Sequence, residues 1–90
     1  DVYKRQTDTW ESMGMMKKKN VIQKFKKFQI NHGLLKKTKK QTKVLHCLPA
    51  HRGQEITDDV IDGKDSLVWD EAENRLYAHQ AILLWCLKQI

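Results

Sequence analysis

The feature that most constrains the fold is a short apolar run near the middle of the chain, Val44 to Leu48, which Pro49 ends. A run of this length without polar alternation is typical of a strand that is buried on both faces of a parallel sheet. Ser66 to Trp69 is a second short run of this kind, for which we expect another buried strand. Because helical segments separate the predicted strands, the sequence indicates an α/β fold, a Rossmann-like parallel sheet with flanking helices.

Several segments around these strands have helical patterns. Met15 to Phe28 carries apolar residues at intervals of three and four among many lysines, which predicts an amphipathic helix. Leu34 to Lys39 is expected to form a short helical turn, and Thr57 to cap a short helix over Asp58 to Ile61. The buried stripe of the first helix is predicted to consist of Val21, Ile22, Phe25 and Phe28.

The last helix is predicted from about Glu71 to Ile90, with Asp70 as its N-cap and Glu73 in the capping-box position. Its residues from Ala81 to Leu87 are apolar on nearly every side, whereas a surface helix has a single apolar stripe. Such a helix needs two packing partners, and a chain of 90 residues offers few candidates for the second. We therefore expect the chain to be part of a larger protein.

The net charge of +6 raises the question of a nucleic-acid partner. Most lysines lie between Lys17 and Lys43, whereas Gln54 to Asp70 is acidic, so the charge is segregated along the chain. This distribution favours a solvated helix face over a binding stripe. A small basic RNA-binding module is the alternative from a different class, but it needs exposed aromatic residues, and we expect Phe25 and Phe28 to be buried.

The apolar runs and the cysteine spacing favour a cytoplasmic protein without a disulfide framework or a zinc site. No apolar run approaches the length of a membrane span and no signal peptide is visible, so we expect a cytoplasmic protein with no membrane partner. Cys47 and Cys86 form no CxxC pair, which argues against a disulfide framework or a zinc site. Cys86 is assigned to the core. His46 is predicted to be a hydrogen-bonded residue at a strand end and not a metal ligand.

Three motifs lie at strand ends or helix starts, where ligands bind in open α/β sheets. They are Asp8-Thr9-Trp10-Glu11-Ser12-Met13-Gly14, then His46-Cys47-Leu48-Pro49, then Ala72-Glu73-Asn74-Arg75. In the same order they resemble the D-x-W-x-S-M-G loop, the H-C-L-P motif and the A-E-N-R motif of the ornithine carbamoyltransferase family. The resemblance covers most of the chain from Thr7 onward.

The resemblance implies a fragment of the aspartate/ornithine carbamoyltransferase fold and a transferase of arginine biosynthesis. The reaction moves the carbamoyl group of carbamoyl phosphate to the δ-amine of L-ornithine, giving citrulline and phosphate, with no cofactor and no metal. An alkylammonium must lose a proton before it can attack, and negative charge that grows on oxygen needs fixed donors. The intact family enzyme is a homotrimer.

The resemblance also assigns the ornithine contacts. Asp8 would hold the α-ammonium, Ser12 and Met13 would complete the loop around the substrate, and Cys47 would lie beside the δ-amine. Without the resemblance, Asp8 and Ser12 would be interpreted as helix caps, which is a frequent role of these residue types.

For carbamoyl phosphate, the resemblance assigns Cys47, the backbone carbonyl of Leu48 and the guanidinium of Arg75. Cys47 and Arg75 are the predicted catalytic residues, the first as proton acceptor or orienting group and the second as a charged donor fork. In isolation, Cys47 would be interpreted as a small buried hydrophobe and Arg75 as a surface arginine.

The sequence departs from the family in two ways. Lys4, Arg5 and Gln6 stand where the family has a buried apolar strand, so we expect residues 1–6 to be a non-native lead and residues 7–90 to be the carboxy-terminal part of the ornithine-binding domain. The S-x-R-T and H-P-x-Q motifs are absent, so we expect the chain alone to be inactive and its last helix to pack on a missing amino-terminal domain. A carbamoyltransferase for another amine, such as putrescine, is the alternative within the class.

Overall fold

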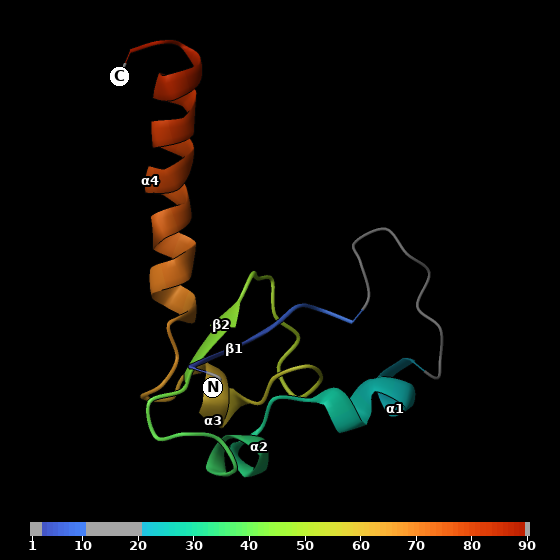
Figure 1. Ribbon diagram of the computed structural model, residues 1–90. Coiled ribbons are helices and arrows are strands. Elements are labelled where there is room, and N and C mark those ends of the chain that lie inside the picture. Colours follow the sequence, from blue (N-terminus) through green and yellow to red (C-terminus); the bar gives the residue numbers. More distant parts are fainter. Residues whose placement is uncertain (1–2, 11–20, 90) are drawn as a thin grey trace.

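The computed structural model describes residues 3–10 and 21–89. In Figure 1 the short helices lie below a parallel pair of strands, and one long helix stands away from them. The predicted α/β fold with a parallel sheet is confirmed. The elements in chain order are β1 (Lys4–Thr7), α1 (Val21–Phe25), the 3-10 helix η1 (Lys26–Phe28), α2 (His32–Lys36), β2 (Lys43–His46), α3 (Asp58–Ile61) and α4 (Val68–Cys86).

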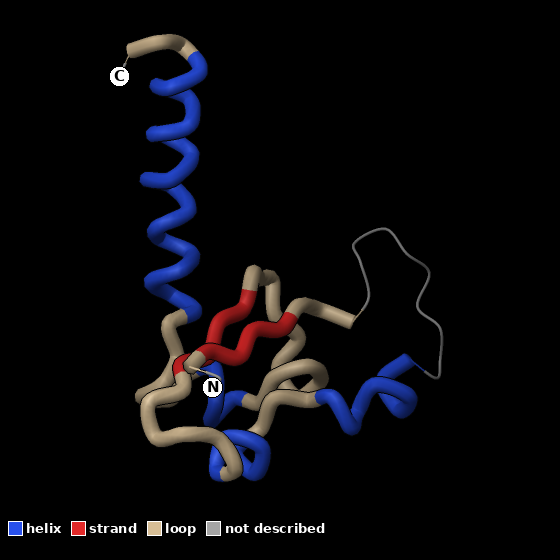
Figure 2. The backbone as a smooth tube through the Cα atoms, in the orientation of Figure 1, coloured by secondary structure: helices blue, strands red, loops and turns tan. Residues whose placement is uncertain are grey.

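The two strands run side by side in register from Lys4 opposite Lys43 to Thr7 opposite His46 (Figure 2). β1 is exposed, so the charges that it carries in place of apolar residues meet solvent here. β2 is covered on its other edge, where the backbone of Val44 bonds to Asp65 and Leu67, both at 2.9 Å. This double pairing makes β2 the buried strand that its apolar run predicted.

The core lies between β2, α3 and the loop that joins them. Ile30 and Ile56 form a parallel bridge that ties the segment before α2 to the segment before α3. Leu34, Leu35, Leu48 and Ala50 pack against this core from its margins. The buried apolar residues are Ile30, Val44, Ile56, Val60, Ile61 and Val68.

Two short helices form near the predicted positions, one with the predicted bounds and one shifted toward the amino terminus. α3 spans the predicted residues with Thr57 at its N-cap, although the Thr57 side chain makes no capping hydrogen bond. α2 begins earlier than the predicted turn because the Asn31 side chain caps it, accepting a hydrogen bond from the Leu34 N–H at 2.9 Å. Gly63 ends the α3 region, where an added Cβ would lie 2.5 Å from the Asp59 carbonyl oxygen.

The predicted strand over Ser66 to Trp69 is wrong. Only Ser66 pairs with β2, as a single bridge to Val44, and the chain then turns into α4 at Val68. A short apolar run at the edge of a core fits a strand or a buried helix start equally well, and here the helix prevails. α4 therefore starts before the predicted Asp70 cap, with Leu67 as its N-cap.

α4 also ends before Ile90, in a Schellman motif. Its C-cap is Leu87, and Lys88 follows in the left-handed conformation with φ 58°. The Gln89 N–H donates to the Leu84 carbonyl at 2.8 Å and the Lys88 N–H to the Trp85 carbonyl at 3.0 Å. A lysine at a position that usually favours glycine gives no stop signal in the sequence.

The predicted buried stripe of the first helix is wrong as well. Ile22, Phe25 and Phe28 are 47%, 40% and 60% exposed. Phe25 instead stacks on Trp10 at 6.0 Å between ring centroids and contacts Phe28 at 6.2 Å. Apart from Trp10, which covers Phe25 in part, nothing in the described part of the chain packs on this face. Residues 15–20 of the predicted helix lie outside the described residues.

α4 projects away from the other described elements, and most of its length contacts none of them (Figure 1). Its apolar side chains are exposed almost throughout, and Cys86 is exposed too, which corrects its assignment to the core. Within residues 3–10 and 21–89, no helix combines the length and the apolar character that crossing a bilayer requires.

Candidate functional site

The ends of β1 and β2 bring Asp8 and Cys47 together. Because Thr7 pairs with His46 in register, the next residue of each strand leaves the sheet at the same edge. The thiol of Cys47 donates a hydrogen bond to the carboxyl of Asp8, whose Oδ1 also accepts from the Thr9 N–H at 2.7 Å. Two residues far apart in the sequence thus form one polar contact at the carboxyl ends of parallel strands.

This contact shifts both groups in opposite directions. The hydrogen bond from Cys47, then that from the Thr9 N–H, lowers the pKa of Asp8. The hydrogen bond to Asp8 raises the pKa of Cys47, and partial burial and the negative charges of Asp8 and Glu71 add to the rise. At neutral pH the site therefore holds an ionised Asp8 and a protonated Cys47 thiol.

Leu48 follows Cys47 in a turn of unusual backbone conformation. Its φ of 55° lies in the left-handed region, which a residue with a Cβ rarely adopts. Its N–H donates to Nδ1 of His46 at 2.8 Å, and its side chain packs against the core. The peptide bond from Leu48 to Pro49 is cis.

His46 is the hydrogen-bonded strand-end residue that the sequence predicted. It is only 1% exposed, and its Nε2 lies 2.7 Å from Oε1 of the fully buried Glu55. The same Glu55 oxygen accepts from the His51 N–H at 2.8 Å. Sequence reasoning missed Glu55, because an acid in a polar loop is ordinarily exposed and nothing in its neighbourhood marked it as buried.

Glu71 ties α4 to the end of β2. Its Oε2 accepts a hydrogen bond from the His46 N–H at 3.0 Å. Arg75 lies one helical turn later and shares a shallow pocket of about 420 Å³ with Glu71 and Leu45. The structure thus places Arg75 beside Glu71, while neither Asp8 nor Cys47 lines this pocket. The remaining lining residues are Leu67, Asp70, Asn74 and Ala78.

Ser12 and Met13, the other predicted ornithine contacts, lie outside the described residues. Of the described candidates, the structure brings Asp8 and Cys47 into contact and holds Leu48 directly after Cys47. Among the described residues, no group of three or more His, Cys, Asp or Glu side chains is arranged to hold a metal ion.

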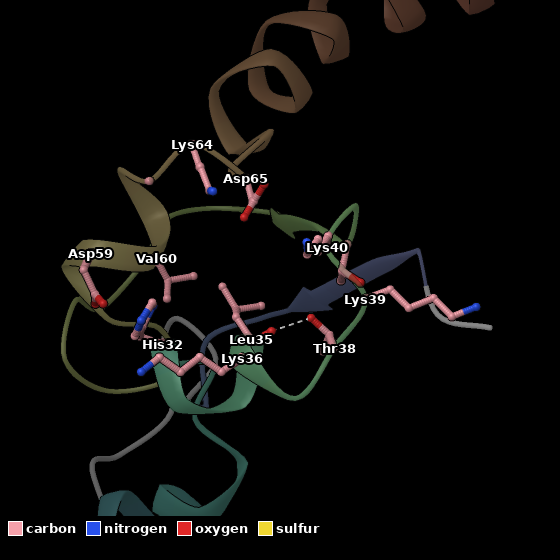
Figure 3. Close-up of a pocket in the computed structure, with 12 residues that line it drawn as sticks. His32, Leu35, Lys36, Thr38, Lys39, Lys40, Asp59, Val60, Lys64 and Asp65 are labelled. Atoms are coloured by element: carbon pink, nitrogen blue, oxygen red, sulfur yellow. Dashed lines mark hydrogen bonds between the residues drawn. The ribbon is translucent and has the colours of Figure 1, made fainter.

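A second hollow, larger than the one beside Arg75, lies near the amino end of β2 (Figure 3). It measures about 760 Å³ and is lined by Leu35, Val60 and Thr42 with several lysines and aspartates around them. The Thr38 hydroxyl donates to the Leu35 carbonyl at 2.7 Å on its wall. None of the predicted site residues that the structure describes lines it, so we place the candidate site at the opposite end of β2.

Comparison with known proteins gives a consistent result. A family model described as "Aspartate/ornithine carbamoyltransferase, Asp/Orn binding domain" matches residues 6–86. The ornithine carbamoyltransferase of Rhodococcus opacus is 57% identical over 84 residues, and that of Mycolicibacterium gilvum is 55% identical over 84 residues. Each match covers 92% of this chain and 27% of the relative, so the chain spans about a quarter of the length of the curated relatives that it matches.

Solved structures agree with the sequence matches. The crystal structure of ornithine carbamoyltransferase from Gloeobacter violaceus superposes with a TM-score of 0.77 at 47% identity, covering 90% of this chain and 26% of that one. The anabolic ornithine carbamoyltransferase of Campylobacter jejuni superposes with a TM-score of 0.81 at 37% identity, covering 92% of this chain and 27% of that one.

Proposed function

The chain belongs to the aspartate/ornithine carbamoyltransferase family through its Asp/Orn-binding domain, and from this premise we propose that it supplies the ornithine-binding half of an ornithine carbamoyltransferase. In the proposed reaction the neutral δ-amine of L-ornithine attacks the carbonyl carbon of carbamoyl phosphate. A carbon–nitrogen bond forms, the carbon–oxygen bond to phosphate breaks, and phosphate leaves with the electron pair. The amine gives up a proton to the departing phosphate, and the products are citrulline and phosphate.

The observation that carries this proposal is the contact between Asp8 and Cys47. A carboxylate with a lowered pKa suits the α-ammonium of an amino acid, because it stays ionised wherever the ligand is cationic. The thiol in hydrogen-bonding contact with it lies within reach of the same ligand. One edge of the sheet can therefore offer L-ornithine both an anion and a proton-exchanging group.

The raised pKa of Cys47 gives ligand binding the role of activating the thiol. In the free site, Asp8 keeps the Cys47 thiol protonated, and a protonated thiol cannot accept a proton. An ammonium that pairs with Asp8 offsets its charge and competes for its hydrogen bond, which lowers the pKa of Cys47. The thiolate then becomes available to take the proton of the δ-ammonium.

We propose the other roles from the resemblance to the family. Ser12 and Met13 complete the ornithine loop, Leu48 binds the carbamoyl amide through its backbone carbonyl, and Arg75 binds the oxygens of carbamoyl phosphate. We propose no cofactor, and we propose a cytoplasmic homotrimer of arginine biosynthesis as the intact enzyme. The chain alone is expected to be inactive.

We further propose that α4 packs on the amino-terminal domain of the intact enzyme. An exposed apolar surface of this extent marks an interaction site in a soluble protein. The relatives are several times longer than this chain, so the rest of such a protein is the natural occupant. The exposed apolar residues of the helix include Leu76, Tyr77, Ile82, Leu83, Leu84 and Trp85.

A hybrid enzyme tests the proposed function. In it, this chain replaces the segment that it matches in the Rhodococcus opacus relative, which supplies the remaining sequence. The hybrid is expected to form citrulline from carbamoyl phosphate and L-ornithine and to leave putrescine largely unreacted, as measured by mass spectrometry of the products. Carbamoylputrescine as the main product would favour the alternative amine. A folded hybrid that binds carbamoyl phosphate but carbamoylates neither amine would contradict the proposal.

The hybrid also tests the proposal that residues 1–6 are a non-native lead. In an extended sheet, more strands would flank β1 and bury it, and buried charges are costly unless they are paired. Replacing Lys4, Arg5 and Gln6 with the residues of the relative is expected to raise the melting temperature of the hybrid. An unchanged or lower melting temperature would contradict the proposal.

The exposure of Phe25 and Phe28 favours one second candidate, RNA binding. Lys27 lies over the Phe28 ring at 5.3 Å from its centroid, and lysines surround both aromatics. Exposed rings among cations are the surface on which single-stranded bases stack. Salt-dependent RNA binding that Phe25→Ala and Phe28→Ala abolish, while Asp8→Asn leaves it intact, would establish this function. Absence of binding at low salt would exclude it.

A further inference from the structure

We propose that the buried pair of His46 and Glu55 is a positioning device, which holds the turn of Cys47 and Leu48 in its reactive arrangement. The expected effect on catalysis rests on the proposed function. The hydrogen bonds of His46 and Glu55 that support the inference do not depend on that function. Neither residue is expected to touch substrate. Both act through the turn between them.

Glu55 closes the loop that carries the turn. Its Oε1 accepts from two donors, Nε2 of His46 at 2.7 Å and the N–H of His51 at 2.8 Å. These donors lie at the two ends of the segment that contains Cys47 and Leu48. One carboxylate oxygen therefore links His46 to the far end of the segment, while Glu71 holds its start by accepting from the His46 N–H.

His46 holds the middle of the same segment. The N–H of Leu48 donates to Nδ1 of His46, and because a backbone N–H can only donate, Nδ1 must carry the lone pair. The imidazole proton then sits on Nε2 and points at Glu55. Glu55 thus selects the tautomer that leaves Nδ1 free to hold Leu48.

Burial and backbone conformation explain why the turn needs such a hold. Leu48 has a positive φ, which its side chain disfavours, so the turn would relax if no bond fixed it. The pair is almost completely buried, where a hydrogen bond meets little competition from water. Two apolar residues could fill the same volume, but they would offer no acceptor to the Leu48 N–H.

Two substitutions of one residue separate the two contacts. In His46→Asn, the side-chain oxygen can take the place of Nδ1 and accept from Leu48, while the contact with Glu55 is lost. In His46→Gln, the side-chain amide can reach Glu55, while the acceptor for Leu48 is lost. Arg52→Gln is the matched control, because Arg52 lies in the same loop and its guanidinium pairs with the exposed Asp58 and Asp62.

The first readout is the pKa of the Cys47 thiol in the 90-residue chain. Cys86→Ser leaves Cys47 as the single thiol, and thiolate absorbance is followed against pH. His46→Gln is expected to lower the midpoint toward about 8.5, the value of a free thiol, because Cys47 moves away from Asp8. His46→Asn and Arg52→Gln are expected to keep the midpoint of the parent. Equal midpoints in all variants would overturn the inference.

The second readout is citrulline formation by the hybrid enzyme. His46→Gln is expected to lower kcat about 100-fold, the scale of a misplacement of about 1 Å, with a smaller change in KM for L-ornithine. His46→Asn is expected to retain most of the activity. If both variants lose activity, or fail to fold, to the same extent, the pair has only a structural role and the inference is overturned. If the parent hybrid makes no citrulline, the proposed function fails, and the thiol titration still decides the inference.

Discussion

The Cys47 thiol donates a hydrogen bond to the Asp8 carboxylate across the ends of two parallel strands. A cysteine proposed to accept a proton is thus held in its protonated form by the residue proposed to bind the substrate. The arrangement couples the two functions, because any cation that occupies Asp8 also changes the protonation of Cys47. This coupling can be tested by changing Asp8 and measuring the pKa of Cys47.

The first test removes the negative charge. Asp8→Asn is expected to lower the pKa of Cys47, because the hydrogen bond to a carboxylate is the largest cause of its rise. Thiolate absorbance in the Cys86→Ser background measures the shift, and Asp65→Asn, at the opposite end of β2, is the control. An Asp8→Asn midpoint equal to that of the parent would mean that the contact is not maintained in solution.

The same shift predicts how stability depends on pH. Because the pKa of Cys47 is raised in the folded chain, its contribution is fully present below the ordinary thiol value of about 8.5 and is lost as pH rises through the folded value. The melting temperature of the parent is therefore expected to fall over this alkaline range more than that of Asp8→Asn. Parallel curves for the two proteins would argue against the linkage.

A prediction about stability concerns the core. Ile56 is fully buried between β2 and α3, so Ile56→Ala is expected to cost about 2 to 5 kcal/mol in free energy of unfolding, enough to unfold a small chain. Ile82→Ala on the exposed α4 removes the same atoms and is expected to stay within about 0.5 kcal/mol. Urea denaturation compares them, and similar losses would show that the core is wrongly located.

The proposed role of α4 predicts different effects of one substitution in the 90-residue chain and in the hybrid enzyme. Leu83→Ser is expected to leave the melting temperature of the 90-residue chain unchanged, because Leu83 is exposed there. In the hybrid enzyme the same change is expected to lower the melting temperature, since the helix would be covered by the amino-terminal domain. No loss in the hybrid would remove α4 from that interface.

Arg75 gives a test on the second substrate. In the hybrid, Arg75→Lys is expected to raise KM for carbamoyl phosphate roughly tenfold or more, because lysine keeps the charge but lacks the planar donor fork. KM for L-ornithine is expected to change little. Arg52→Lys is the control, as Arg52 pairs with Asp58 and Asp62 away from the site. An unchanged KM for carbamoyl phosphate would leave Arg75 as a surface residue.

Much of the fold could be predicted where local pattern and burial agree. The apolar run of β2 and the helix after Thr57 came out nearly as expected, because each is both locally favoured and buried against the core. The start of α4 could not be predicted, since a short apolar run bears no mark of whether it continues as strand or helix. Its C-terminal stop was also hidden, because Lys88 and not glycine adopts the left-handed conformation.

Burial was predicted least well for apolar helix faces that need another element to pack on them. Phe25 and Phe28 fit an apolar stripe, and a stripe predicts burial only if something packs on it. The site was predicted from motifs that resemble a family, whereas Glu55 was missed. Its importance comes from three-dimensional contacts with His46 and His51, which no spacing in the sequence displays.

The most direct measurement is a double-mutant cycle on kcat/KM for L-ornithine in the hybrid enzyme. It compares Asp8→Asn, Cys47→Ala and the double variant, after circular dichroism has shown that each is folded. If both side chains act on one substrate through their mutual contact, each single change is severe and the double variant loses far less than the product of the two losses. Losses that simply multiply, or near-normal activity for either single variant, would contradict the account.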